Sequence, residues 1–232
     1  MKNLIIYTTN DKVISLHLVN KIITNKKFKN YKIDIFLSKA NFLRKIKILL
    51  VIIFFGSFTR FCKQLKKKIT IKSILNNNKN CQVIKKINKN KNYEYGLSVY
   101  CSSKIKIRKY KIYNFHLGSL KSQRGSFIFF YKFIRKWNFI YLTFHEISER
   151  FDVGKIINEK KIKFSSKCSA TDIFFIYLDN LNFLIKSIDK IKTNKKKEYK
   201  NIGKLNLVPS FLELFKNIFF YFFDLKKLTR LK

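Results

Sequence analysis

The sequence predicts an α/β protein in which helices flank a mostly parallel, Rossmann-like sheet. Its 232 residues are enough for one such domain with an extension. Hydrophobic residues make up 47% of the chain, which indicates a folded protein rather than a disordered one. Short strand-type runs alternate with longer helix-type stretches, a pattern typical of parallel strands joined by crossover helices.

The N-terminal half shows this alternation clearly. The chain turns polar within ten residues and has no cleavage site, so its start predicts a first strand and not a signal peptide. In order, we expect a strand at Leu4–Thr8, a helix at Lys12–Ile23, a strand at Ile33–Leu37, a helical stretch at Asn41–Lys68 that bends at Gly56, and a strand at Cys81–Ile87.

The second half continues the pattern with shorter connections. We expect strands at Gly96–Cys101 and Lys111–His116, a helix at Gly125–Lys136, strands at Phe139–Ile147 and Lys155–Ile162, and a helix at Thr171–Ile191. The segment Asn88–Tyr95 is too short for the helix expected before the strand at Gly96. We therefore expect one helical layer of the sheet to be reduced.

The chain divides into a main domain, residues 1–191, and an extension, residues 192–232. The extension begins with a charged linker and contains the only proline, Pro209. It ends in an amphipathic helix over Leu212–Phe223, with an apolar face formed by Leu214, Phe215, Ile218 and Phe222. We expect this face to pack against the core or a partner, and the basic pair Lys226 and Lys227 leaves attachment to anionic lipid as an alternative.

No segment predicts a membrane span. The longest uninterrupted apolar run, Ile48–Phe55, is far shorter than the ~20 residues that a spanning helix needs. The four cysteines are widely spaced and form no Cys-x-x-Cys motif, so we expect free thiols in a reducing, cytoplasmic compartment. No group of His, Asp and Glu has the spacing of metal ligands, so we expect no metal site.

The chain is strongly basic, with a formal net charge of +38. Such a charge favours binding to nucleic acids or other polyanions. Lysine, asparagine, isoleucine, phenylalanine and tyrosine, however, have AT-rich codons, so the base composition of the genome explains much of the excess. It does not explain why there are only 13 acidic residues. A nucleic-acid partner is therefore an alternative, and we favour a compositional origin of the charge.

One stretch, YNFHLGSLKSQRGSFIFF at residues 113–130, departs from the Lys- and Asn-rich background. Asn114 and His116 alternate on an expected strand, so their side chains point to the same face. An amide beside a titratable imidazole suits acyl transfer, because the amide can bind a developing oxyanion while the imidazole manages protons. In open parallel sheets, ligands bind at the carboxyl ends of the strands, where these two residues lie.

This stretch resembles the folate-dependent formyltransferase family, which includes the glycinamide ribonucleotide, methionyl-tRNA and sugar N-formyltransferases. The family signature combines Asn-x-His, Pro-Ser/Gly-Leu-Leu-Pro, Arg-Gly, Thr-x-His or Thr-x-Met, and Asp-x-Gly. This chain matches it without a gap through Asn114, His116, Gly118, Leu120, Arg124, Gly125, Thr143, His145, Asp152, Gly154 and Ile156. Leu117 and Lys121 stand where the family has the two prolines. The resemblance implies a formyltransferase fold and an enzyme that uses 10-formyltetrahydrofolate, without a metal.

The resemblance also implies roles for particular residues. Asn114, His116 and Asp152 would be catalytic: the amide would bind the formyl oxygen, the imidazole would assist there and in proton transfer, and the carboxylate would hold the imidazole. The folate would contact Ser103, Lys104, Ile105 and Phe151, and the acceptor would contact Gly118, Arg124 and His145.

The acceptor amine is less clearly indicated. The first loop, YTTNDKVIS, has no Gly-rich phosphate cradle, which argues against glycinamide ribonucleotide. The residues after Ile191 are too few for the C-terminal domain of methionyl-tRNA enzymes. We therefore expect a small-molecule amine, and specifically an amino sugar carried on a nucleotide. The alternatives are a truncated methionyl-tRNA formyltransferase and a basic, non-catalytic RNA-associated protein that retains the fold.

Overall fold

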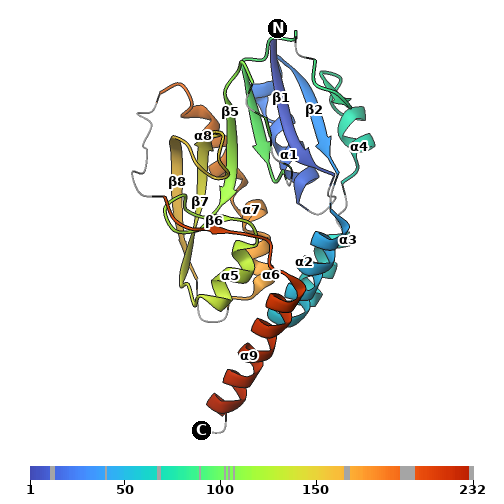
Figure 1. Cartoon of the computed structure of the whole chain (residues 1–232). Coiled ribbons are helices and arrows are strands. Elements are labelled where there is room, and N and C mark those ends of the chain that lie inside the picture. The colour runs from blue at the N-terminus through green and yellow to red at the C-terminus, as the bar shows by residue number, and fades with distance from the viewer. Residues whose placement is uncertain are drawn as a thin grey trace.

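The computed structural model describes residues 1–10, 14–39, 41–66, 69–88, 90–101, 103, 105–106, 108–164, 168–193 and 202–229. Its centre is a seven-stranded sheet in the order β3-β2-β1-β4-β5-β7-β8 (Figure 1). The strands are β1 (Lys2–Thr9), β2 (Tyr31–Ser38), β3 (Cys81–Ile84), β4 (Tyr95–Val99), β5 (Ile112–Leu117), β7 (Phe139–Glu146) and β8 (Ile156–Lys163). The first five run parallel, whereas β7 and β8 run antiparallel to their neighbours. The predicted mostly parallel α/β sheet is confirmed.

Helices cover one face of this sheet, and the larger hydrophobic core lies between these helices and the sheet. Leu4 and Ile6 of β1 contribute to this core, as do Leu18 and Ile22 of the first helix, and all four are fully buried. The helices with buried residues in this core are α1 (Ser15–Ile23), α2 (Phe42–Phe55), α4 (Ile71–Asn76), α5 (Ile128–Ile134), α6 (Ala170–Phe174), α7 (Ile176–Asp179), α8 (Leu181–Asp189) and α9 (Phe211–Thr229). A short 3-10 turn, η1 (Lys26–Phe28), follows α1, and α3 (Phe58–Lys66) follows α2.

The opposite face carries a smaller core that connecting segments close. Ile5 and Tyr7 of β1 pack there with Tyr93 and Ile112, and the hydroxyls of Tyr7 and Tyr110 lie 2.5 Å apart. The described residues between β3 and β4 form no helix, as the short connection predicted. The helical layer is therefore reduced on this face.

Two expected helices differ from those observed. The stretch expected at Thr171–Ile191 is divided into α6, α7 and α8, because the backbone leaves helical geometry at Phe175 and again at Asn180. The side-chain amide of Asn180 donates to the carbonyl of Ile176 at 2.9 Å. The helix expected from Gly125 begins only at Ile128. Residues Arg124–Gly125 instead form a short strand, β6, and Phe127 has a φ of 58°.

The expected bend at Gly56 is confirmed as the break between α2 and α3. An added Cβ at Gly56 would lie 2.4 Å from the hydroxyl of Thr171, and that hydroxyl accepts a hydrogen bond from the Ser57 backbone N–H at 2.7 Å. The close approach of α6 thus requires glycine at this position. The helix α4 was not expected, since its segment is rich in lysine and asparagine.

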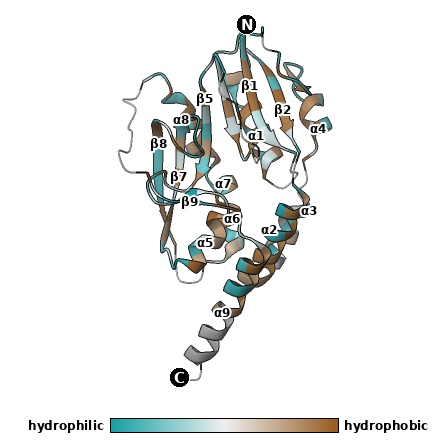
Figure 2. Ribbon diagram, in the orientation of Figure 1, coloured by the Kyte–Doolittle hydropathy of each residue, from teal (hydrophilic) through white to brown (hydrophobic). Residues whose placement is uncertain are grey.

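The extension is attached to the main domain before it forms its helix. Strand β9 (Leu205–Asn206) pairs in parallel with β6, and α9 (Phe211–Thr229) then projects away from the sheet (Figure 1). Leu214 and Ile218 of α9 are buried, while Leu212 and Phe219 are largely exposed. Brown, hydrophobic positions and teal, hydrophilic ones both occur along the coloured part of α9 (Figure 2). In the described part of the chain, no helix is long and apolar enough to cross a membrane.

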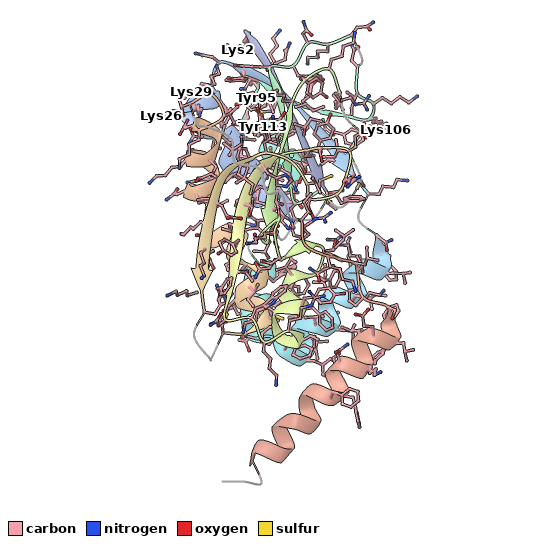
Figure 3. All side chains as sticks on the ribbon, turned by 60° about the vertical axis from the view of Figure 1, so that its left-hand side comes forward. Lys2, Lys26, Lys29, Tyr95, Lys106 and Tyr113 are labelled. Carbon is pink, nitrogen blue, oxygen red and sulfur yellow. The ribbon has the colours of Figure 1, made fainter. Side chains whose placement is uncertain are left out.

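Basic side chains leave the molecule in different directions. Lys26 and Lys29 point outward on one side of the sheet, and Lys106 lies on the other, with Tyr95 and Tyr113 packed between them (Figure 3). The rings of Tyr95 and Tyr113 meet edge to face with centroids 6.2 Å apart.

Candidate active site

Asn114 and His116 lie at the carboxyl end of β5 and point to the same side, as the sequence predicted. Both reach the same carboxylate: Asp152 Oδ1 is 3.5 Å from Asn114 Nδ2 and 3.5 Å from His116 Nδ1. Asp152 lies in the connection between β7 and β8, well separated from β5 in sequence. The structure therefore brings these three side chains together, and we refer to them as the Asn-His-Asp group.

The position of Asp152 is set by its backbone and by the start of β6. Its φ of 48° is in the left-handed region, which aspartate tolerates better than most residues. Its second oxygen, Oδ2, accepts a hydrogen bond from the backbone N–H of Gly125 at 2.8 Å. One carboxylate oxygen is thus held by the scaffold while the other faces Asn114 and His116.

His116 has an oxygen acceptor near each ring nitrogen. Its Nε2 lies 3.2 Å from the carbonyl oxygen of Gln123, and its Nδ1 faces Asp152. The side chain is 7% exposed and that of Asp152 is 13% exposed, so water competes little for this pair. With acceptors on both sides, the ring can hold a proton on either nitrogen, which suits a group that accepts and returns protons.

Gly118 allows the chain to pass close to this imidazole. Its φ of 134° is rarely adopted by other residues, and an added Cβ would lie 2.0 Å from the carbonyl oxygen of Gln123 and 2.9 Å from His116 Nε2. The carbonyl of Gly118 accepts a hydrogen bond from the hydroxyl of Thr143 at 2.7 Å. Gly118 therefore shapes the site through its backbone.

His145 lies directly opposite Asn114 on the neighbouring strand β7. Its Nδ1 is 3.0 Å from the carbonyl oxygen of Glu146, so Nδ1 carries the proton and Nε2 is an acceptor. Asn114 Nδ2 lies 3.3 Å from that Nε2. This contact orients the amide so that its nitrogen faces the imidazole of His145 and the carboxylate of Asp152.

Burial lowers the pKa of His145 to about 4, with the nearby His116 acting in the same direction and Asp152 opposing it. Because an unfolded histidine titrates near pH 6.5, the unfolded chain binds this proton first as the pH falls. The stability contribution of neutral His145 is therefore complete above about pH 6.5 and is lost as the pH falls toward 4.

We expect the free energy of unfolding of the unmodified chain to fall by about 3 kcal/mol more than that of His145→Gln between pH 7.5 and pH 4. Glutamine cannot titrate, and its oxygen can still accept from Asn114. Urea unfolding at several pH values measures this difference. Parallel pH profiles for the two proteins would show that His145 is not a buried neutral histidine.

Arg124 holds two separate backbone segments. Its Nη1 donates to the carbonyl of Gly203 at 2.7 Å, and its Nη2 donates to that of Phe151 at 2.8 Å. Its own carbonyl accepts from the side chain of Asn206 at 2.7 Å. The guanidinium thus connects the extension to the residue before Asp152, and it does not line the cavity described next.

A cavity of about 720 Å³ opens beside the Asn-His-Asp group. Aromatic side chains form much of its wall, including those of Tyr100, Phe127, Phe129, Phe174 and Tyr177. A second cavity of about 80 Å³ adjoins it and shares Cys101, Asn114, Phe151 and Asp152 with it. The group therefore lies where two spaces meet, as a transfer between two substrates requires.

The residues expected to contact folate lie around the smaller cavity. Ser103 and Ile105 line it, and Phe151, half exposed, lines both cavities. Lys104 is outside the described residues. His145 also lines the smaller cavity. Among the described residues, no three His, Cys, Asp or Glu side chains are grouped so that they could hold a metal ion.

Two supporting residues were not expected from the sequence. Gln123 is buried, and its side chain accepts from the Tyr141 N–H at 3.0 Å and donates to the Phe139 carbonyl at 3.1 Å, which places its own carbonyl beside His116. The hydroxyl of Tyr177 accepts from the Leu117 N–H at 2.7 Å. Both roles depend on tertiary contacts, so no local pattern in the sequence indicated them.

This sheet, with the Asn-His-Asp group at the carboxyl end of β5, has the fold of the folate-dependent formyltransferases. The fold likeness rests on solved structures. No protein-family model matches the sequence, and no curated protein matches it.

Three of the similar structures are N-formyltransferases. WlaRD, a sugar 3N-formyltransferase crystallised in the presence of dTDP and 5-N-formyl-THF, superposes with a TM-score of 0.62 at 17% identity, over 89% of this chain and 69% of that one. An N-formyltransferase from Helicobacter canadensis in complex with folinic acid and dTDP-3-aminofucose gives 0.61 at 19%, over 89% and 71%. A 4-N-formyltransferase from Francisella tularensis gives 0.57 at 20%, over 89% and 76%.

Proposed function

We propose that this protein transfers a formyl group from 10-formyltetrahydrofolate to a primary amine of a small substrate carried on a nucleotide. The observation that carries the proposal is the convergence of Asn114 and His116 on Asp152 at the meeting point of the two cavities. The neighbouring folds, which include enzymes crystallised with folates and dTDP compounds, support the same class of reaction.

The acceptor amine would attack the formyl carbon of the folate. The bond between that carbon and folate N10 would then break, so that tetrahydrofolate leaves with a proton on N10 in exchange for the proton that the amine loses. One N–H of Asn114 would donate to the formyl oxygen as negative charge develops there, in place of its 3.5 Å contact with Asp152. His145 would keep this amide in the donating orientation. The amide is therefore arranged before the reaction, which is what makes such a donor effective.

His116 and Asp152 would manage the proton that the amine loses. Asp152 would hold the imidazole ring in place through Oδ1, while its Oδ2 stays bound to the Gly125 N–H. The buried position of both side chains strengthens their interaction.

The smaller cavity suits the flat, polar-edged ring of a folate. Ile105, Ile147 and Phe151 give it apolar walls, while Ser103 and Ser148 give it polar edges. It is narrow in this structure, so we expect the exposed side chain of Phe151 to move when a folate binds. Gly118 and Arg124 would shape the acceptor side indirectly, through the backbone segments that they hold.

The net charge of +38 supports two alternatives. In the first, the acceptor is an aminoacyl group on RNA. In the second, the protein binds RNA and has no catalytic activity. The described cysteines are all free, which fits our proposal of a cytoplasmic protein.

A direct assay separates these alternatives. The purified chain is incubated with 10-formyltetrahydrofolate and either dTDP-linked amino sugars or methionyl-tRNA, and formylated product is detected by mass spectrometry. We expect product from an amino sugar. If only methionyl-tRNA gives a formylated product, the acceptor is methionyl-tRNA and not an amino sugar. No product from any amine, together with RNA affinity that falls steeply with salt, would identify an RNA-binding protein and overturn the proposed function.

A further inference from the structure

The larger cavity extends from the Asn-His-Asp group to helix α2, where its wall becomes cationic. Arg44 and Lys45, in the first turn and a half of α2, line it together with Asn41. Among the described residues that line it, Asp152 is the single carboxylate. One end of the same space thus carries the transfer chemistry, and the other carries two positive charges.

Neither cation has a carboxylate partner within the described residues. Other basic side chains of this chain do find one: Arg60 pairs with Asp172, and Lys91 pairs with Asp34 at 2.8 Å. The guanidinium of Arg44 instead lies over the ring of Phe127, 5.7 Å from its centroid. A half-buried arginine on an aromatic wall keeps its donors available for a ligand.

The field of Arg44 reaches groups that line the cavity. Burial raises the pKa of Tyr177 and of Cys101, and in both cases the positive charge of Arg44 opposes this rise. Both residues line the larger cavity. The charge of Arg44 therefore acts on the interior of the cavity and not only on bulk solvent.

Contacts at both ends hold α2 in this position. Val51 and Ile52 are fully buried in the main core. Lys47, one turn after the cavity-lining cations, donates to the carbonyl of Pro209 at 2.5 Å and lies 4.7 Å from the ring centroid of Phe211. The extension thus fixes the segment of α2 that carries Arg44 and Lys45.

We propose that Arg44 and Lys45 bind a phosphate group of the acceptor substrate while its amine reaches the Asn-His-Asp group. This inference rests on the proposed function and adds the chemistry by which the acceptor is held. Arginine and lysine are the side chains that bind phosphate best, and a volume of about 720 Å³ is within the usual range for nucleotide-sized ligands. The aromatic wall beside Arg44 offers stacking surfaces for a base.

The test measures binding alone, without folate or turnover. Thymidine diphosphate is titrated into the purified full chain by calorimetry at ~150 mM salt, where unspecific attraction to a basic surface is screened. We expect the double variant Arg44→Ala/Lys45→Ala to weaken binding by at least about tenfold. Arg44→Lys, which keeps the charge but not the planar fork, should lose less.

The matched control is Lys21→Ala/Lys72→Ala, which removes the same charge from exposed positions on α1 and α4 outside the cavity. A single-stranded RNA oligonucleotide, titrated in parallel, tests the other source of phosphate. Weaker thymidine diphosphate binding only in the α2 variant assigns the site to a nucleoside diphosphate. If only RNA binding is weakened, and only in the α2 variant, the site binds an RNA phosphate.

Equal losses in the two double variants, no loss in either, or no binding of either probe would overturn the inference. Because the binding experiment measures no formyl transfer, its result is independent of the result of the formyl-transfer assay. A chain that binds thymidine diphosphate through α2 but never transfers a formyl group would retain this site and lose the enzyme activity.

Discussion

Replacing His116 with alanine is expected to lower the turnover of formyl transfer by about 10²–10⁴-fold, the usual contribution of a positioned acid-base group. The imidazole is buried, faces Asp152 at 3.5 Å, and has a second acceptor in the Gln123 carbonyl. Alanine has neither ring nitrogen to carry a proton, and water has little access to the buried site to take over that role. Single-turnover kinetics with saturating formyl donor and amine measure the loss.

His17→Ala is the matched control, because His17 lies on α1 and does not line either cavity. Circular dichroism of both variants shows whether the fold is retained. Turnover that survives His116→Ala unchanged would mean that the motif is inherited from the fold and that the proton is handled elsewhere.

Replacing Asn114 with alanine is expected to lower turnover by about 10²–10³-fold, the scale observed when one oxyanion donor is removed. Folate binding should change little, because the donor acts mainly on the charge that develops in the transition state. The two effects separate in a measurement of kcat beside the Kd of a folate analogue.

Asn182→Ala, on the exposed surface of α8, is the control for loss of an asparagine. A variant at Asn114 that loses folate binding in proportion to its activity would show that Asn114 holds the cofactor and does not stabilise an oxyanion. A variant with full activity would remove Asn114 from the mechanism.

The alternation of apolar runs was sufficient to predict the sheet, because buried parallel strands are short, apolar and separated by longer helical segments. It could not predict β6 and β9, each of two residues, since such short strands have no periodicity of their own. Nor could it show that Asn180 divides the last long helical stretch, because that break depends on where the side chain of Asn180 finds its acceptor.

The candidate site shows the same limit. Strand alternation predicts that Asn114 and His116 share a face, and the family resemblance supplied Asp152, which no local pattern connects to them. The contributions of Gln123 and Tyr177, and the place of Arg44 on the cavity wall, follow from packing between distant segments. Residues of that kind are visible only once the chain is folded.

A crystal structure with 5-formyltetrahydrofolate would show whether Asn114 and His116 face the formyl group. We expect the pterin in the smaller cavity, beside Ser103, Ile105 and Phe151, with the formyl oxygen within about 3.2 Å of Asn114 Nδ2 and the formyl carbon facing the larger cavity. A folate bound elsewhere, or one whose formyl group points away from Asn114 and His116, would contradict this expectation.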